Sequence, residues 1–180
     1  MWRLLEDRRR TTYQILIVVW LIVSDYAIAH DQVIVRVAPE HFTIYHDPLW
    51  GIQTPWLLAA AYAFRASFIG LFLGIALVLA GRGGDWPKLT PRQLYLGTLM
   101  VILATESCAV LSGLWAYWKE GPLYPSMFYP DPSLPMLVTA TVQVTCYLAS
   151  AIFSGALIVW CLVRRRRSAK LASISLVGSE

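Results

Sequence analysis

Apolar residues gather in four long stretches along the chain, and most charged residues lie between them. The stretches cover residues 12–29, 56–80, 94–118 and 135–163. A helix of about 17 to 25 apolar residues crosses a hydrocarbon core of about 30 Å, so each stretch is long enough for one transmembrane helix. The pattern therefore predicts an all-α membrane protein, a four-transmembrane-helix bundle in which residues 1–180 form one integral membrane domain.

Two of the predicted helices carry start signals in the sequence. Thr54-Pro55 precedes the second stretch, and Thr90-Pro91 precedes the third. A hydroxyl residue at the N-cap followed by proline at the first helical position is typical of a helix start. Gln93 completes a capping box with Thr90.

The composition supports a membrane location. Of the 180 residues 57% are hydrophobic and 14% are charged, and the mean hydropathy is +0.55. Soluble proteins have about 45–50% apolar and about 25% charged residues, and disordered chains are more polar still. The net charge of +4 does not indicate nucleic-acid binding, because the basic residues abut apolar stretches instead of forming one soluble face.

The basic residues also predict the orientation. The N-terminus, the 81–93 loop and the C-terminal tail together hold twelve of the fifteen Lys and Arg residues. Cytoplasmic segments carry this excess, so both termini are expected in the cytoplasm. An alternative stays open at Ala27-Ile28-Ala29, which has the form of a signal-peptidase site; cleavage there would leave three spans.

Three ionisable residues fall inside the predicted spans. Counted along the helices, Arg65 and Glu106 lie at similar depths below the outer boundary, and Asp25 lies near that level on the first span. A charge in hydrocarbon is costly, so we expect Arg65 to pair with Glu106 across adjacent helices, with Asp25 as a second partner. The cluster is either a substrate, ion or proton path, or a structural pin that fixes helix register.

The fourth stretch carries a polar stripe at helical spacing, which we expect to face the bundle interior. Its hydroxyl and amide groups would bond between helices, and small residues on the second and third spans would allow close packing. The stripe consists of Thr139, Gln143, Cys146, Tyr147, Ser150 and Ser154, and the small residues include Gly70, Gly74 and Gly113.

The two outer loops, residues 30–55 and 119–134, carry different signals. The first is expected to form a small β-hairpin with strands at 32–37 and 42–45, because the first of these is rich in β-branched residues. It also holds His30, His41 and His46. These histidines form a metal site only if their three rings converge on one point. The second is rich in proline and aromatic residues, so it is either a rigid cap or a docking surface for another subunit.

The chain lacks the motifs of several enzyme classes. No P-loop and no dinucleotide-binding glycine motif is present. Because no histidine falls within the four stretches, bis-histidine haem ligation and a Ser-His hydrolase inside the bilayer are disfavoured. We expect no cofactor and no catalysis.

The segment from Pro39 to His46, PEHFTIYH, is followed by Pro48, a long span and a loop containing Pro87-Lys88-Leu89-Thr90. In these features the chain resembles a group of uncharacterised small bacterial membrane proteins with four predicted spans. The resemblance implies a location in the inner membrane and no known activity, so it carries over no catalytic residue.

Three functions remain open on the sequence alone. The first is a structural or accessory membrane component that contacts lipid and partner subunits. The second is a small transporter or ion-handling protein built around Arg65 and Glu106. The third is a metal-binding protein that uses the outer histidines.

Overall fold

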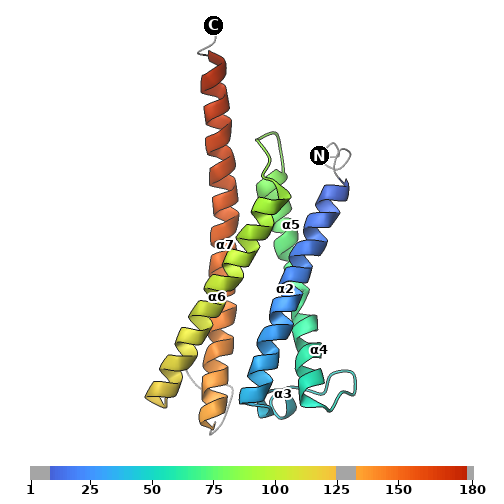
Figure 1. Ribbon diagram of the computed structural model, residues 1–180, viewed down its shortest axis with the longest axis vertical. Coiled ribbons are helices and arrows are strands. Elements are labelled where there is room, and N and C mark those ends of the chain that lie inside the picture. Colours follow the sequence, from blue (N-terminus) through green and yellow to red (C-terminus); the bar gives the residue numbers. More distant parts are fainter. Residues whose placement is uncertain (1–8, 125–132, 178–180) are drawn as a thin grey trace.

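The computed structural model describes residues 9–124 and 133–177, the last four of these by backbone alone. All secondary structure in these residues is helical. The helices are α2 (Arg9–Val37), α3 (Glu40–Thr43), α4 (Pro55–Ser67), α5 (Ile69–Arg82), α6 (Pro91–Lys119) and α7 (Leu134–Val177). With α4 and α5 counted as one span, four helices are long and apolar enough to cross a membrane, which confirms the predicted all-α, four-span architecture (Figure 1).

The spans pack as two pairs that are joined to each other. α6 packs along α7, and α2 packs against both α4 and α5. Contacts of α5 with α7 and of α2 with α6 join the pairs. In Figure 1 the α5–α6 loop, the start of α2 and the end of α7 lie toward one end of the bundle, and α3 lies at the other. α2 and α7 therefore each contact all three other spans.

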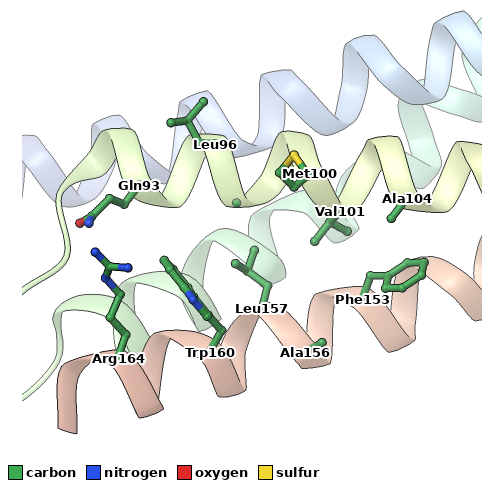
Figure 2. Close-up of a pocket in the computed structure, with 11 residues that line it drawn as sticks. Gln93, Leu96, Met100, Val101, Ala104, Phe153, Ala156, Leu157, Trp160 and Arg164 are labelled. Carbon is green, nitrogen blue, oxygen red and sulfur yellow. The ribbon is translucent and has the colours of Figure 1, made fainter. Parts of the chain in front are cut away.

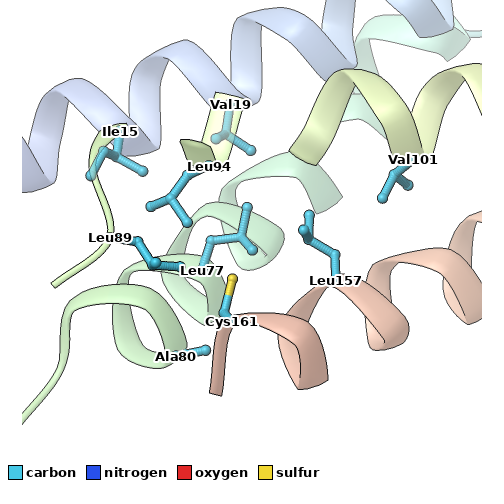
Figure 3. Packing of buried hydrophobic residues seen from close by; sticks show 9 residues of the cluster. All are labelled: Ile15, Val19, Leu77, Ala80, Leu89, Leu94, Val101, Leu157 and Cys161. Carbon is cyan, nitrogen blue, oxygen red and sulfur yellow. The ribbon is translucent and has the colours of Figure 1, made fainter. Parts of the chain in front are cut away.

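Buried apolar residues form one core cluster near the end of the bundle that holds the α5–α6 loop. All four spans contribute to it (Figure 3). Most other large apolar side chains point outward: Phe72 is 71% exposed, Met100 63% and Ile152 67%. An apolar exterior of this kind is suited to lipid. The cluster comprises Ile15, Val19, Leu77, Ala80, Leu89, Leu94, Val101, Leu157 and Cys161.

Glycines set the closest helix contacts, as the sequence predicted. A Cβ added to Gly70 would lie 2.9 Å from Cβ of Val23 on α2, and one added to Gly113 would lie 2.6 Å from Cγ2 of Val142 on α7. Packing of small residues is what lets transmembrane backbones approach closely. The α2–α5 and α6–α7 interfaces therefore depend on glycine.

The second span is broken, not straight. α4 ends at Ser67 and α5 begins at Ile69. The Ser67 hydroxyl donates to the Phe64 carbonyl at 2.7 Å and accepts from the Ser24 hydroxyl at 2.8 Å. Serine bonds to the preceding turn favour bending of a helix. The Trp20 ring packs against both Phe64 and Phe68, so α2 supports both halves of the span.

The predicted β-hairpin is wrong. α2 continues as a helix to Val37, past both the end of the predicted span and Ala27-Ile28-Ala29, and α3 occupies the first half of the predicted second strand. Ile34 and Val35 are buried in a cluster with Phe42 and Leu58. β-propensity differs by only about 1 kcal/mol between residue types and depends on context, so this burial outweighs it.

α7 extends well past residue 163, the predicted end of the fourth span. Its 44 residues would measure about 66 Å at 1.5 Å per residue, about twice the hydrocarbon thickness. The sequence after residue 163 contains neither proline nor glycine before Gly178 and is rich in good helix formers, so nothing ends the helix. Its C-terminal part projects beyond the bundle (Figure 1).

Arg165 fixes α7 to the α5–α6 loop. Its side chain is buried, and its guanidinium donates to backbone carbonyls of Ala80 at 2.8 Å, Pro87 at 2.9 Å and Trp86 at 3.1 Å, and also to that of Gly83. Carbonyls at a helix C-terminus carry partial negative charge, which suits a cation. One arginine thus holds the end of α5 and the following turn against α7.

Candidate functional site

A polar network between α2, α6 and α7 is centred on Glu106. Oε2 of Glu106 lies 2.9 Å from Nδ1 of His30 and accepts a hydrogen bond of 2.9 Å from the Tyr26 hydroxyl. Glu106 is 13 residues from Lys119, about 20 Å along α6, so the carboxylate lies near the middle of the span. Two groups of α2 therefore bind one carboxylate of α6 deep in the bundle.

Helical spacing explains why α2 supplies two partners. Tyr26 and His30 are four residues apart, so their side chains lie on the same face. Their ring centroids are 5.7 Å apart. That spacing is visible in the sequence, but it identifies a site only once α2 is known to remain helical beyond residue 29.

The fourth span completes the network. Nε2 of Gln143 donates to Oδ1 of Asp31 at 3.2 Å, and the Tyr26 hydroxyl lies 3.3 Å from Sγ of Cys146. Gln143 and Cys146 are three residues apart and share a face of α7. Hydrogen bonds between helices in a membrane each contribute roughly 0.6 to 2 kcal/mol, so the network ties three spans together.

The expected pairing of Arg65 with Glu106 is wrong. Among the residues that the structure describes, no ion pair joins them: Arg65 is exposed on α4, while Glu106 binds α2. Packing gives the reason, because α4 lies against α2 and contacts between α4 and α6 are few at most. Asp25 is also exposed and belongs to no described ion pair. Of the predicted charge cluster, only Glu106 lies in the network.

The polar stripe of α7 is divided between interior and surface. Thr139, Gln143 and Cys146 are buried, as expected, whereas Tyr147 is 64% exposed, contrary to expectation. Ser150 and Ser154 are half-buried, and the Ser150 hydroxyl donates to the Tyr147 carbonyl at 2.9 Å. Only the part of the stripe nearest the start of α7 therefore faces the other spans.

The three histidines do not converge. His30 lies inside the span and binds Glu106, which corrects the expectation that no histidine would be intramembrane. His41 and His46 pack together near α3, with ring centroids 4.7 Å apart. Within residues 9–124 and 133–177, no group of three or more His, Cys, Asp or Glu side chains is placed to hold a metal ion.

His41 and His46 belong to a separate aromatic cluster outside the spans. Nδ1 of His46 lies 2.6 Å from the His41 carbonyl oxygen, and its ring packs against Tyr62. The Tyr62 hydroxyl donates to the Asp47 carbonyl. Burial, and to a smaller extent the nearby His46, lower the pKa of His41 to about 4. His41 is therefore neutral in the folded protein at neutral pH.

Half of the second outer loop cannot be compared with its prediction, because residues 125–132 lie outside the described part of the chain. Of its aromatic residues, Tyr124 is described, and its hydroxyl lies 3.0 Å from that of Thr145 on α7.

His30 and Glu106, the two residues at the centre of the polar network, differ in burial. The side chain of His30 is 6% exposed, whereas that of Glu106 is 40% exposed. Nε2 of His30 is buried and has no hydrogen-bond partner among the described residues. Nδ1 of His30 and Oε2 of Glu106 are within hydrogen-bond distance, and part of the carboxylate side chain remains exposed.

No family model, no curated protein and no solved structure matches the chain, so its functional residues are identified from its own geometry.

Proposed function

We propose that this chain is a multi-pass protein of the bacterial inner membrane with its N- and C-termini in the cytoplasm. The described basic residues support this orientation, because most of them belong to the start of α2, the α5–α6 loop and the end of α7, which lie at one end of the bundle (Figure 1). Cytoplasmic segments are enriched in such residues. A reporter fused at Asp85 should give a cytoplasmic signal, and a periplasmic signal would contradict the orientation.

Within that membrane, the proposed role is that of a non-catalytic accessory component that binds a partner transmembrane segment through α6. One observation carries this role: Glu106 is a carboxylate near mid-span, and 40% of its side chain is exposed. Hydrocarbon cannot solvate that surface, so intramembrane carboxylates face protein or a water-filled cavity. A polar group on a neighbouring helix would supply the missing solvation.

The surface around Glu106 is shaped for a helix. Leu103, Val110 and Leu114 are each about half exposed or more, and they follow one another at intervals of seven and four residues along the same side of α6. Ser107 lies between them, and its hydroxyl donates to the Leu103 carbonyl at 2.8 Å. This apolar stripe runs beside Glu106, which fits an amphipathic transmembrane partner that presents a hydrogen-bond donor toward the carboxylate.

Site-specific photo-cross-linking in native membranes tests the role. A photoreactive residue at Val110 should give a discrete protein adduct, whose mass distinguishes a second copy from a different subunit. The same group at Phe72, which is exposed on α5, is the matched control and should give lipid adducts. The Glu106→Leu variant, with its helix content checked by circular dichroism, should lower the Val110 yield. Equal yields at Val110 and Phe72 would contradict the role.

Proton handling is the second candidate. It is favoured by the 2.9 Å contact between His30 and Glu106, two titratable side chains on the neighbouring spans α2 and α6. The partner of Glu106 is thus His30 and not Arg65, the partner expected from the sequence. Proteoliposomes with a pH gradient should then show a proton flux that His30→Phe abolishes and Arg65→Gln leaves intact. A flux no greater than that of empty liposomes would exclude this candidate.

A further inference from the structure

An open groove runs between α6 and α7 at the basic end of the bundle, away from the Glu106 network. Its volume is about 600 Å³, within the range of sites that bind small ligands. Figure 2 shows Gln93 and Arg164 at one end, directed toward each other, with Leu157 and Phe153 along the wall. Three small residues, Gly97, Ala104 and Ala156, belong to the lining.

The length of the groove matches one leaflet of a bilayer. Its lining extends from Gln93 to Ala104 on α6 and from Phe153 to Arg164 on α7. The first and last residues of each stretch are eleven positions apart, about 16 Å at 1.5 Å per residue. Half of a hydrocarbon core of about 30 Å is about 15 Å. An apolar chain that begins at the level of Arg164 would therefore reach the bilayer middle.

The polar end of the groove is positively charged. Arg164 is exposed, and its guanidinium lies 5.3 Å from the centre of the Trp160 ring, which holds the charge at the mouth. Opposite it, Oε1 of Gln93 accepts from the Thr90 backbone N–H at 2.9 Å, a bond that orients the amide whose NH₂ group remains a donor. Donors above an apolar slot suit a phosphate attached to acyl chains.

We propose that this groove binds an anionic phospholipid, with the phosphate on Arg164 and one acyl chain between α6 and α7. The phosphate of a zwitterionic lipid is accompanied by that lipid's own cation, so only an anionic lipid brings net negative charge to the guanidinium. Because the lining shares no residue with the α6 surface around Glu106, the lipid site can be present whether or not that surface binds a partner.

Native mass spectrometry of the purified full chain in detergent tests the site. Phosphatidylglycerol and phosphatidylcholine with the same acyl chains are titrated in turn. Phosphatidylglycerol should bind about fivefold more tightly, the ratio expected for one basic side chain on an anionic headgroup. Arg164→Gln should remove this preference. The matched control, Arg166→Gln, changes an exposed arginine outside the groove and should keep it.

Filling the groove with a larger side chain tests whether it holds an acyl chain. Ala156→Phe should weaken the binding of both lipids, and Ala104→Phe fills the same slot from α6 if the first variant fails to fold. Equal affinity for the two lipids in the unchanged protein would overturn the proposal. Equal loss of the phosphatidylglycerol preference in the Arg164 and Arg166 variants would also overturn it, because it would indicate a general effect of surface charge. Lipid affinity that is retained in a folded variant with the groove filled would overturn it as well.

Discussion

Replacing Arg165 with methionine should destabilise the bundle by about 3 kcal/mol. The guanidinium donates to four backbone carbonyls, of which that of Ala80 is fully buried and those of Gly83, Trp86 and Pro87 are partly buried. Losing the buried bond to a charged donor costs about 1.5 to 3 kcal/mol. The partly buried carbonyls regain water, so each should add only about 0.5 kcal/mol.

Equilibrium unfolding in mixed detergent micelles, followed by circular dichroism, measures this loss. Arg166→Met is the matched control, because Arg166 is exposed on the same helix, and its effect should stay within about 0.5 kcal/mol. Arg165→Lys should fall between the two, since an ammonium cannot reach all four carbonyls at once. Equal effects of Arg165→Met and Arg166→Met would refute the assignment of Arg165 as the anchor of the α5–α6 loop.

Two other predictions concern packing and pH. Gly70→Ala should destabilise by about 1 to 3 kcal/mol, because its Cβ would lie 2.9 Å from that of Val23, whereas Gly155→Ala, with nothing within 4 Å, should be neutral or stabilising in the same unfolding assay. The pKa of His41 is lowered to about 4, so the unfolded chain binds more protons below about pH 6.5. The free energy of unfolding should therefore fall by up to about 3 kcal/mol from pH 6.5 to 4. Thermal unfolding of His41→Phe over this range should show a smaller fall. Identical pH dependences of the two proteins would contradict the lowered pKa of His41.

The helices were predictable because length, hydropathy and start signals act locally. The capping box is an example. The Thr90 hydroxyl accepts from the Gln93 backbone N–H at 3.3 Å, and Oε1 of Gln93 accepts from that of Thr90 at 2.9 Å. Both bonds depend only on residues within one turn. In contrast, Thr54 makes no side-chain cap bond, although the same kind of signal precedes α4.

The partner of Glu106 was not predictable from depth. Counting residues along a helix gives the level of a side chain in the membrane but not the direction in which it points. Arg65 and Glu106 share a level, yet α4 packs on α2 and not on α6. His30 was assigned to a loop because apolar residues become fewer after Ala29, and the burial that keeps α2 helical involves residues distant in sequence.

The role of Arg165 was also not predictable from the sequence. In the sequence it is one of four consecutive arginines, all of which signal a cytoplasmic location. Only packing separates it from its neighbours. It lies four residues after Cys161 and eight after Leu157, both of which are in the core cluster, so helical spacing turns it inward while Arg164 and Arg166 stay exposed.

A double-mutant cycle tests most directly whether Glu106 joins α6 to α2. Unfolding free energies are measured for Glu106→Leu, His30→Leu and Arg65→Leu singly, and for Glu106→Leu combined with each of the other two. The structure predicts a coupling of about 0.5 to 2 kcal/mol between Glu106 and His30, and about zero between Glu106 and Arg65. A coupling to Arg65 that equals or exceeds the coupling to His30 would contradict it.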